Sequence, residues 1–288
     1  MSKLVSIIAP AYKHEKYIEE CILSIANQDY LNKQLIIIDD NSPDATPSLI
    51  EQVINRVEII REFPGGITFI KHEKNKGAHY SINEGLNTAT GEYLTIINTD
   101  DLFEPNRLSE MIKSIESQNA QICFSKVDTV DSNSNILRNE EWEYYNELQK
   151  KISQYPTINM ALLTDNVAIS TGNMLFTKTL YERIGPFKDY KYIHDWDFIL
   201  KCTLITEPVY VESTQYLYRL HETNSFKELQ KDQELCYRES MEVLTRYCRN
   251  IKIRTQIENE LIPEIDTWEY FIHEVIKNPD IAHIWIHS

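Results

Sequence analysis

Short apolar runs alternate with stretches of helical periodicity through the first half of the chain. The apolar runs predict buried strands, at residues 4–12, 34–40, 67–72, 93–97 and 121–127. The stretches between them predict helices, at residues 18–25, at 47–56, between Gly77 and Gly91, and from Pro105 to Ser117. Continuous apolar strands that alternate with helices indicate a mainly parallel sheet with helices on both faces.

The second half of the chain has a less regular pattern. Residues 128–168 are rich in Asn, Glu and Tyr and show little periodicity, which favours an insertion or a flexible segment near the active face. Residues 171–187 predict a strand followed by a helix, and residues 195–205 predict a helix with acidic residues in its first turn. From residue 226 the chain is charged and helical, so we expect C-terminal helices that either pack back on the preceding domain or pair two chains as a homodimer.

Polar clusters follow several of the predicted strands. They are Ala11-Tyr12, Asp39-Asp40 and the stretch from Asn98 to Asp101. Because ligands bind at the carboxyl ends of parallel strands, we expect these clusters to converge on one crevice. Asp100 and Asp101 are adjacent acids after an apolar strand, and burying either carboxylate unpaired is costly. They are therefore either solvated loop acids or groups that face a cation such as a metal ion.

Composition narrows the class of protein. The chain has 288 residues, of which 42% are hydrophobic and 25% charged, which is typical of a globular protein. The formal net charge of -15 argues against a nucleic-acid partner and against general attraction to anionic lipid. The 5 cysteines include no CxxC pair and are expected to be reduced, buried residues rather than disulfides or zinc ligands.

The sequence also bears on localisation. No apolar run reaches the length of a bilayer span, and the N-terminal apolar run is interrupted too early by Pro10 for a signal peptide. We therefore expect a cytoplasmic protein. Basic residues of the C-terminal helices could make peripheral contact with the inner face of the membrane, but acidic residues follow closely and favour a solvated helix of mixed charge.

Several segments, in their order along residues 4–222, together resemble the family 2 glycosyltransferases. They are VSIIAPAYKHEKYIEECILSI, IIIDDNSPDAT, KNKGAHYSINEGLNTATGEYLTIINTDD, GNMLFTKTLYERIGPF and HDWDFILKC. The resemblance implies an inverting enzyme with the GT-A fold, a Rossmann-like α/β architecture, over residues 1–225. Residues 1–127 would form the nucleotide-sugar-binding half and residues 128–225 the acceptor-side half, followed by a C-terminal helical extension over 226–288.

The resemblance implies a donor site at the strand ends. Pro10, Ala11 and Tyr12 would line the nucleotide pocket, and Asp40 would hydrogen-bond the base, with Asp39 as the alternative. Lys76 and Gly77 resemble a phosphate-binding loop, although solvated lysines are the competing interpretation.

The resemblance also implies a metal and diphosphate site. Asp100 and Asp101 would bind Mn²⁺ or Mg²⁺, for which carboxylate oxygens are suitable ligands. Asn98 occupies the position of an acid in the commoner form of the motif, and its carboxamide can still accept a ribose hydroxyl. Arg219 would meet the diphosphate, and His221 would complete the metal shell or contact a phosphate.

An inverting transfer needs a base that takes the proton of the acceptor hydroxyl. The family places an aspartate after a glutamate at a helix start; here the pair is His194-Asp195. Asp195 is the candidate base and Asp197 the alternative. Because the helix dipole keeps a first-turn carboxylate ionised, its basicity must be raised by other features of its environment.

The sequence thus predicts a metal-dependent glycosyltransferase. The donor would be a UDP-sugar, and the acceptor a glycan or a lipid-linked sugar in surface-polysaccharide or glycan biosynthesis. Asn98 and His194 stand where the family has acidic residues. These differences motivate an alternative, a catalytically inactive relative that binds a nucleotide or a glycan. A nucleotidyltransferase would need a glycine-rich loop after the first strand, where the chain reads APAYKHEKY.

Overall fold

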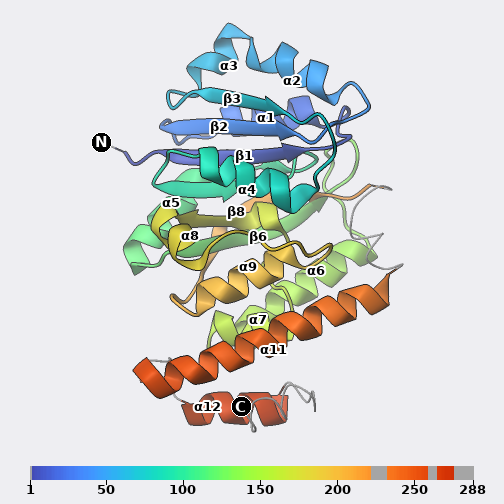
Figure 1. The fold of residues 1–288 in the computed structure, drawn as a ribbon. Helices are drawn as coiled ribbons and strands as arrows, with labels where there is room; N and C mark the ends of the chain where they lie inside the picture. Colours follow the sequence, from blue (N-terminus) through green and yellow to red (C-terminus); the bar gives the residue numbers. More distant parts are fainter. Residues whose placement is uncertain (1, 222–231, 259–264, 276–288) are drawn as a thin grey trace.

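The computed structural model describes residues 2–221, 232–258 and 265–275. Within them an 8-stranded sheet has the order β3-β2-β1-β4-β7-β6-β8-β5 (Figure 1). The strands are β1 (Val5–Ala11), β2 (Lys33–Asp39), β3 (Ile67–Lys71), β4 (Tyr93–Ile96), β5 (Leu102–Phe103), β6 (Ile122–Val130), β7 (Met174–Thr177) and β8 (Val209–Arg219). The helices are α1 (Ile18–Ala26), α2 (Thr46–Ile54), α3 (Val57–Arg61), α4 (Ala78–Thr88), α5 (Arg107–Gln118), α6 (Glu140–Lys150), α7 (Ile158–Thr164), α8 (Lys178–Ile184), α9 (His194–Thr203), α11 (Gln233–Glu258) and α12 (Ile265–Tyr270).

Alternate residues of the central strands supply the cores on the two faces of the sheet. On β1, Val5 and Ile7 pack with the helices α1, α2 and α5, whereas Ile8 points to the other face. That second core contains residues of α4, α7, α8, α9 and α11. Both cores consist of buried aliphatic and aromatic side chains, so the predicted α/β architecture with helices on both faces is confirmed.

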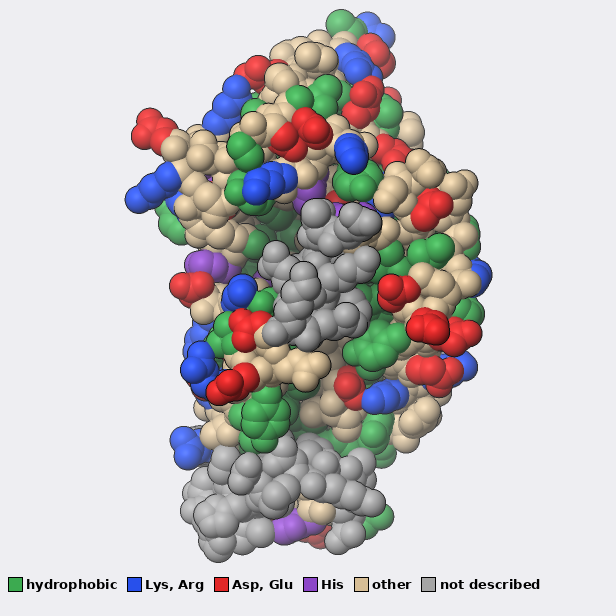
Figure 2. All heavy atoms as spheres, turned by 90° about the vertical axis from the view of Figure 1, so that its right-hand side faces the viewer, with side chains coloured by type: hydrophobic (Ala, Val, Ile, Leu, Met, Phe, Trp, Pro, Cys, Tyr) green, Lys and Arg blue, Asp and Glu red, His purple; other side chains and the backbone are tan. Residues whose placement is uncertain are grey.

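The sheet is mixed, with a parallel N-terminal half. Strands β3, β2, β1 and β4 are parallel neighbours, β7 runs antiparallel between β4 and β6, and β8 is parallel to β6. The parallel strands all end at the right-hand edge of the sheet in Figure 1, and Figure 2 looks directly at that edge. Histidine side chains are visible near the centre of that face in Figure 2.

The expectation of a flexible segment at residues 128–168 was wrong, whereas that of an insertion stays a prediction. β6 continues to Val130, and α6 and α7 follow. Both helices begin at capping residues, because Asn139 accepts a hydrogen bond from Trp142 N and Thr157 accepts one from Met160 N. α6 buries few side chains, so its sequence carries too weak an apolar period to be recognised.

Two further elements differ from the sequence prediction. β8 was not predicted, because polar residues interrupt its apolar positions. The helix expected at 47–56 is present as α2. The short helix α3 was not predicted, and it is separate from α2 because Arg56 between them adopts an extended backbone conformation. The other predicted strands and helices of the first half are present with shifts of at most three residues at their ends.

The C-terminal helices pack back on the domain. Leu244 and Tyr247 of α11 lie in the same core as Phe198 of α9. The Tyr247 hydroxyl lies 2.5 Å from Asn159 Oδ1 and 2.9 Å from Thr203 Oγ1. The expected domain boundary at residues 225 and 226 lies outside the described residues. Among the helices that are described, none is both long and apolar enough to cross a membrane.

Gly91 precedes β4 and allows a close approach of two backbone segments. A Cβ atom at this position would lie 2.6 Å from Leu4 O and 2.8 Å from Ser6 N. Gly91→Ala should therefore lower the free energy of unfolding by roughly 1–3 kcal/mol, the usual cost of overpacking. Urea-induced unfolding would measure it.

Asn87→Ala is the control for this substitution, because Asn87 is exposed on α4. Its effect should stay within about 0.5 kcal/mol. Equal stabilities of the two variants would contradict the assigned role of Gly91.

Candidate active site

The polar clusters after β1, β2 and β4 meet at one edge of the sheet, as the sequence predicts. Asp40 N donates to Ala11 O at 2.9 Å, so the ends of β1 and β2 are joined. Thr99 Oγ1 donates to Pro10 O at 3.1 Å and lies 2.7 Å from Nδ1 of His14. The loops after these strands therefore form one continuous hydrogen-bonded surface.

Asp40 organises the loop that follows β3. Its Oδ1 accepts from Lys76 N at 2.8 Å, and its Oδ2 accepts from Gly77 N at 2.8 Å. His72 Nδ1 lies 2.7 Å from the same Oδ1, and His72 Nε2 lies 2.5 Å from Glu84 Oε2. Gly77 has a φ of 89°, a conformation that strongly favours glycine. The Asp40 carboxylate is thus largely occupied by partners within the chain.

Asp39 has an open acceptor position beside this cluster. Its Oδ2 accepts from Ser42 N at 3.0 Å, but its Oδ1 is buried and has no hydrogen-bond partner within the described residues. Buried polar groups normally have a partner, so this oxygen is suited to a donor group of a ligand. Nearby, Tyr12 is exposed and Lys13 Nζ lies over its ring. Lys76 Nζ lies 4.3 Å from the ring centre of Tyr80.

Asp101 is held by partners within the chain. Its Oδ2 accepts from the Tyr216 hydroxyl at 2.6 Å and from Asn98 Nδ2 at 3.2 Å. Its Oδ1 accepts from Arg219 N at 2.7 Å. Burial and the adjacent Asp100 raise the pKa of Asp101 well above its usual value. A carboxylate at position 98 would place another negative charge against Asp101, whereas the Asn98 amide donates to it.

Asp100 has a different environment. Its Oδ2 lies 3.0 Å from Nε2 of His221 and 3.8 Å from Nε2 of His14. Its Oδ1 accepts no hydrogen bond from another described residue. Burial by itself raises the pKa of Asp100, but His14 and His221 outweigh that effect and the pKa is lowered. Asp100 is therefore the acid with a free oxygen, and it stays ionised.

Arg219 lies behind the acids rather than in the open crevice. Its side chain is fully buried, and its Nε donates to Asp100 O at 2.6 Å. The same guanidinium donates to Glu20 Oε2 at 2.8 Å and to Asp131 O at 2.9 Å. This placement differs from the expected contact with a diphosphate. The guanidinium is already hydrogen-bonded to the Asp100 carbonyl and to other groups of the protein.

Asp195 begins the other half of the candidate site. Its Oδ2 accepts from Asn166 Nδ2 at 3.0 Å, and its Oδ1 accepts from Trp196 N at 2.7 Å. Burial raises the pKa of Asp195, while nearby His194 acts in the opposite direction. This desolvation is the feature that counteracts the helix dipole. The alternative base, Asp197, is almost fully buried and forms an ion pair with Arg246.

Two neighbouring hydroxyl residues connect the halves of the site. Ser170 Oγ accepts from Asn98 Nδ2 at 3.1 Å. Thr171 Oγ1 lies 3.1 Å from Nε2 of His194. The segment before β7 therefore places Asp195 on the same side of the sheet as the loop that carries Asp100.

Several residues of the site were not predicted from the sequence. They are His14, His72, Asn166, Ser170, Thr171 and Tyr216. The strand-end rule could have found His14 and His72, which follow β1 and β3 closely. No comparable signal marks Asn166 or Tyr216, because tertiary packing alone brings them to the acids.

A divalent metal fits the residues around Asp100, with help from a ligand. No group of three or more His, Cys, Asp or Glu side chains that could hold a metal is found in residues 2–221, 232–258 and 265–275. Asp100 offers an open carboxylate oxygen beside two imidazoles, which are suitable ligands for Mn²⁺. Diphosphate oxygens and water would complete the shell, whereas Asp101 could join only by losing its hydrogen bonds.

Comparison with known proteins shows the family to which the chain belongs. The family model described as Glycosyl transferase family 2 matches residues 6–185. An uncharacterized glycosyltransferase of Methanocaldococcus jannaschii is 30% identical over 204 residues, which cover 69% of this chain and 64% of that protein. The chain thus matches less than two thirds of the length of this relative.

Solved structures show the same fold. TarS 1-349 of S. aureus in complex with UDP-GlcNAc has a TM-score of 0.67 at 19% identity, over 94% of this chain and 71% of that one. The mannosyltransferase PcManGT of Pyrobaculum calidifontis, in complex with GDP-Man and Mn2+, has a TM-score of 0.59 at 15% identity, over 99% and 86%. The α/β fold described above is therefore the GT-A fold.

The different environments of the adjacent acids predict different effects of substitution. Asp101→Ala leaves the Tyr216 hydroxyl and Arg219 N–H without an acceptor, which should lower the free energy of unfolding by roughly 1–3 kcal/mol. Asp100→Ala should cost less, because it removes the contacts of one carboxylate oxygen with His221 and His14 in place of the three hydrogen bonds that Asp101 accepts. Urea-induced unfolding without nucleotide or metal would compare them. Equal losses would contradict the division of roles.

Proposed function

Since the chain belongs to glycosyl transferase family 2, we propose that it is a metal-dependent inverting enzyme that transfers a sugar from a UDP-sugar to a hydroxyl of a glycan or lipid-linked sugar. The observation that carries this proposal is that the Ser170-Thr171 segment contacts both Asn98, in the loop that carries Asp100, and His194, next to Asp195. Asp100 is an ionised acid with an open oxygen, and Asp195 is a desolvated acid of raised pKa. The proposed metal-dependent inverting transfer uses one acidic group of each kind, the first to bind the metal ion and the second to act as the base.

The donor binds at the ends of β1, β2 and β4. Asp39 Oδ1 accepts a hydrogen bond from the base, and Asp40 holds the Lys76-Gly77 loop beside it. Tyr12 offers an exposed ring at the same edge. Uracil is the proposed base for two reasons. It has an N–H group that can donate to Asp39 Oδ1, and it is the base that the family resemblance implies. The acceptor belongs to surface-polysaccharide or glycan assembly in this proposal.

Asp100 and His221 would hold Mn²⁺ or Mg²⁺ together with the diphosphate. When bound, the metal ion offsets the negative charge that develops on the departing nucleoside diphosphate. His14 lies at the same carboxylate oxygen of Asp100 and adds a second imidazole. Arg219 supports the site from behind by binding the Asp100 carbonyl.

Asp195 takes the proton of the acceptor hydroxyl. The acceptor oxygen attacks the anomeric carbon from the face opposite the diphosphate, and the bond from that carbon to the diphosphate oxygen breaks. The donor's α-linked sugar thereby becomes β-linked. Asn166 donates to the same carboxylate and fixes its orientation. His194 is held by Thr171 and lies next to the base.

Nucleotide-induced stabilisation tests the donor site. UDP with Mn²⁺ at a hundredfold its dissociation constant should stabilise the protein by about 2.7 kcal/mol, visible as a raised melting temperature. Asp100→Ala should remove the metal-dependent part of this shift. GDP, CDP and ADP are the comparison ligands, and a larger shift with any of them would replace the uridine assignment.

Turnover tests the enzyme against its alternative, an inactive binding relative. Hydrolysis of UDP-glucose or UDP-GlcNAc, in which water replaces the acceptor, gives an assay without a known acceptor. Asp195→Asn should slow this hydrolysis by about 10²–10⁴-fold, the usual contribution of a general base, while the UDP shift persists. A protein that binds UDP but turns over no donor would instead be the binding relative.

The raised pKa of Asp195 predicts a pH dependence. The base must be ionised, so activity is lost as pH falls through its pKa, which burial places above the ordinary value of about 3.9. The acid limb of kcat/KM for UDP-sugar hydrolysis should therefore lie above that value. Asp195→Glu should move the limb, and a limb unchanged in that variant would assign the titration to another group.

A further inference from the structure

We propose that helix α11 positions the catalytic base, through Glu239 and Arg246. This inference rests on the proposed function, in which Asp195 is the base. The family model ends at residue 185, before both α9 and α11, so the match itself assigns nothing to either helix. Glu239 and Arg246 are positioning residues, since they act through the backbone and side chains that carry Asp195.

Glu239 fixes the backbone that leads into α9. Its Oε1 accepts from Lys191 N at 3.0 Å and its Oε2 accepts from Tyr192 N at 3.1 Å. The Glu239 side chain is buried, so water does not compete freely for its oxygens. Hydrogen bonds from N–H groups to an ionised carboxylate are among the stronger ones. Both bonds lie within four residues of Asp195 and set the direction in which α9 begins.

The other end of this segment is also anchored. Asn83 Nδ2 donates to Phe187 O at 2.8 Å, and Asn83 Oδ1 accepts from Phe187 N at 2.9 Å. The residues from Phe187 to Tyr192 are therefore clamped by α4 at one end and by α11 at the other. In sequence, the α11 clamp lies nearer to Asp195 than the α4 clamp does.

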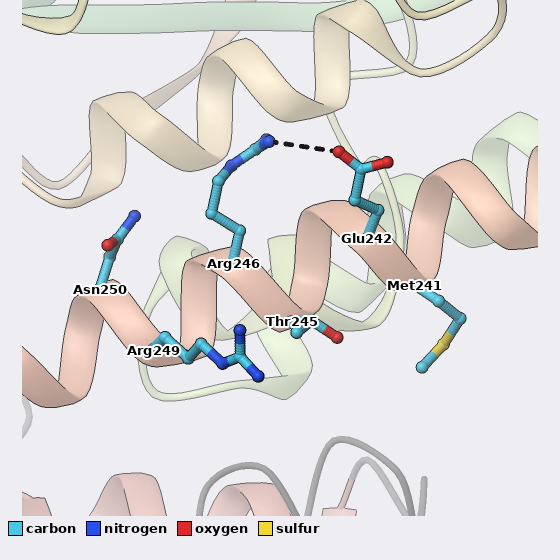
Figure 3. Close-up of a pocket in the computed structure, with 6 residues that line it drawn as sticks. All are labelled: Met241, Glu242, Thr245, Arg246, Arg249 and Asn250. Carbon is cyan, nitrogen blue, oxygen red and sulfur yellow. Dashed lines mark ion pairs between the residues drawn. The ribbon is translucent and has the colours of Figure 1, made fainter. Parts of the chain in front are cut away.

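Arg246 fixes the first turn of α9 directly. It forms an ion pair with Asp197 and donates to the Tyr190 hydroxyl at 3.0 Å. The Tyr190 hydroxyl in turn donates to Glu242 at 2.7 Å. Figure 3 shows Arg246 and Glu242 extending from α11 on the side of the neighbouring helix, whereas Arg249 extends elsewhere. Arg246 thus binds groups within the protein, in place of the contact with a membrane surface that was considered from the sequence.

Tyr247 links the same helix to α7 and α9. Its hydroxyl contacts Asn159 of α7 and Thr203 of α9. α7 ends at Thr164, shortly before Asn166, which donates to Asp195. α11 therefore contacts both α9, which carries Asp195, and α7, which is followed by Asn166. Because a displacement of about 1 Å can cost about a hundredfold in rate, this bracing bears on catalysis.

Glu239→Gln and Glu239→Ala test the inference. The glutamine keeps one acceptor oxygen for the two N–H groups, and the alanine keeps none. We expect kcat for UDP-GlcNAc hydrolysis to fall about tenfold or more in the alanine variant and less in the glutamine variant. The donor KM and the stabilisation by UDP with Mn²⁺ should stay at wild-type values, because the donor site lies on the other half of the domain.

Matched controls lie on the same helix. Glu234→Gln changes an exposed acidic residue of α11, and Arg249→Met changes an exposed basic residue one turn from Arg246. Both should leave kcat within twofold of wild type, whereas Arg246→Met should lower it. If kcat falls as much in the controls as in the Glu239 and Arg246 variants, the inference is overturned. Any substitution in α11 would then be enough to lower kcat.

The remaining outcomes separate this inference from the proposed function. Values of kcat within twofold of wild type in both Glu239 variants would overturn the role of α11. Loss of the UDP-induced stabilisation together with a lower kcat would also overturn it, because α11 would then support the whole domain and not the base alone. Asp195→Asn is measured in parallel. An active Asp195→Asn would remove the proposed base, whereas an inactive one beside active Glu239 variants would remove only the role of α11.

Discussion

Asp101 is held by three donors that come from separate parts of the chain. Asn98 belongs to its own loop, while Tyr216 and the backbone of Arg219 belong to β8. These contacts satisfy the carboxylate oxygens of one of two adjacent acids at the end of a buried strand. The other acid, Asp100, is left with an open oxygen and two imidazoles. Burying an acid pair in this way is tolerable only because one member is fully hydrogen-bonded.

The same constraint explains why β8 matters to the site. Tyr216 can reach Asp101 because Gly172 leaves it room, since a Cβ atom at Gly172 would lie 2.0 Å from the Tyr216 hydroxyl. Gly172 belongs to the segment whose neighbours Ser170 and Thr171 contact Asn98 and His194. One short segment before β7 thus contacts both the loop that carries the acid pair and the start of α9. The surroundings of Asp100 and of Asp195 are therefore joined by packing.

Much of the fold follows from local pattern. The apolar strands of the first half and the helices between them were predicted because each buries a regular set of side chains. The helices of residues 128–168 were missed because α6 buries few residues, and β8 was missed because polar positions interrupt it. The convergence of Asp40, Asn98 and Asp100 was predicted from the strand-end rule. Their partners His72, Tyr216 and Asn166 were not.

The sequence by itself determined the class of fold, the family and the set of acids that can do chemistry. It did so because strand and helix periodicity, and the position of polar residues after strands, are local properties of the chain. Only the tertiary structure decided that Asp101 is sequestered while Asp100 is open, that Arg219 faces the protein interior, and that α11 lies against α9. Adjacent side chains of identical chemistry differ only in what surrounds them, and those surroundings come from residues distant in the sequence.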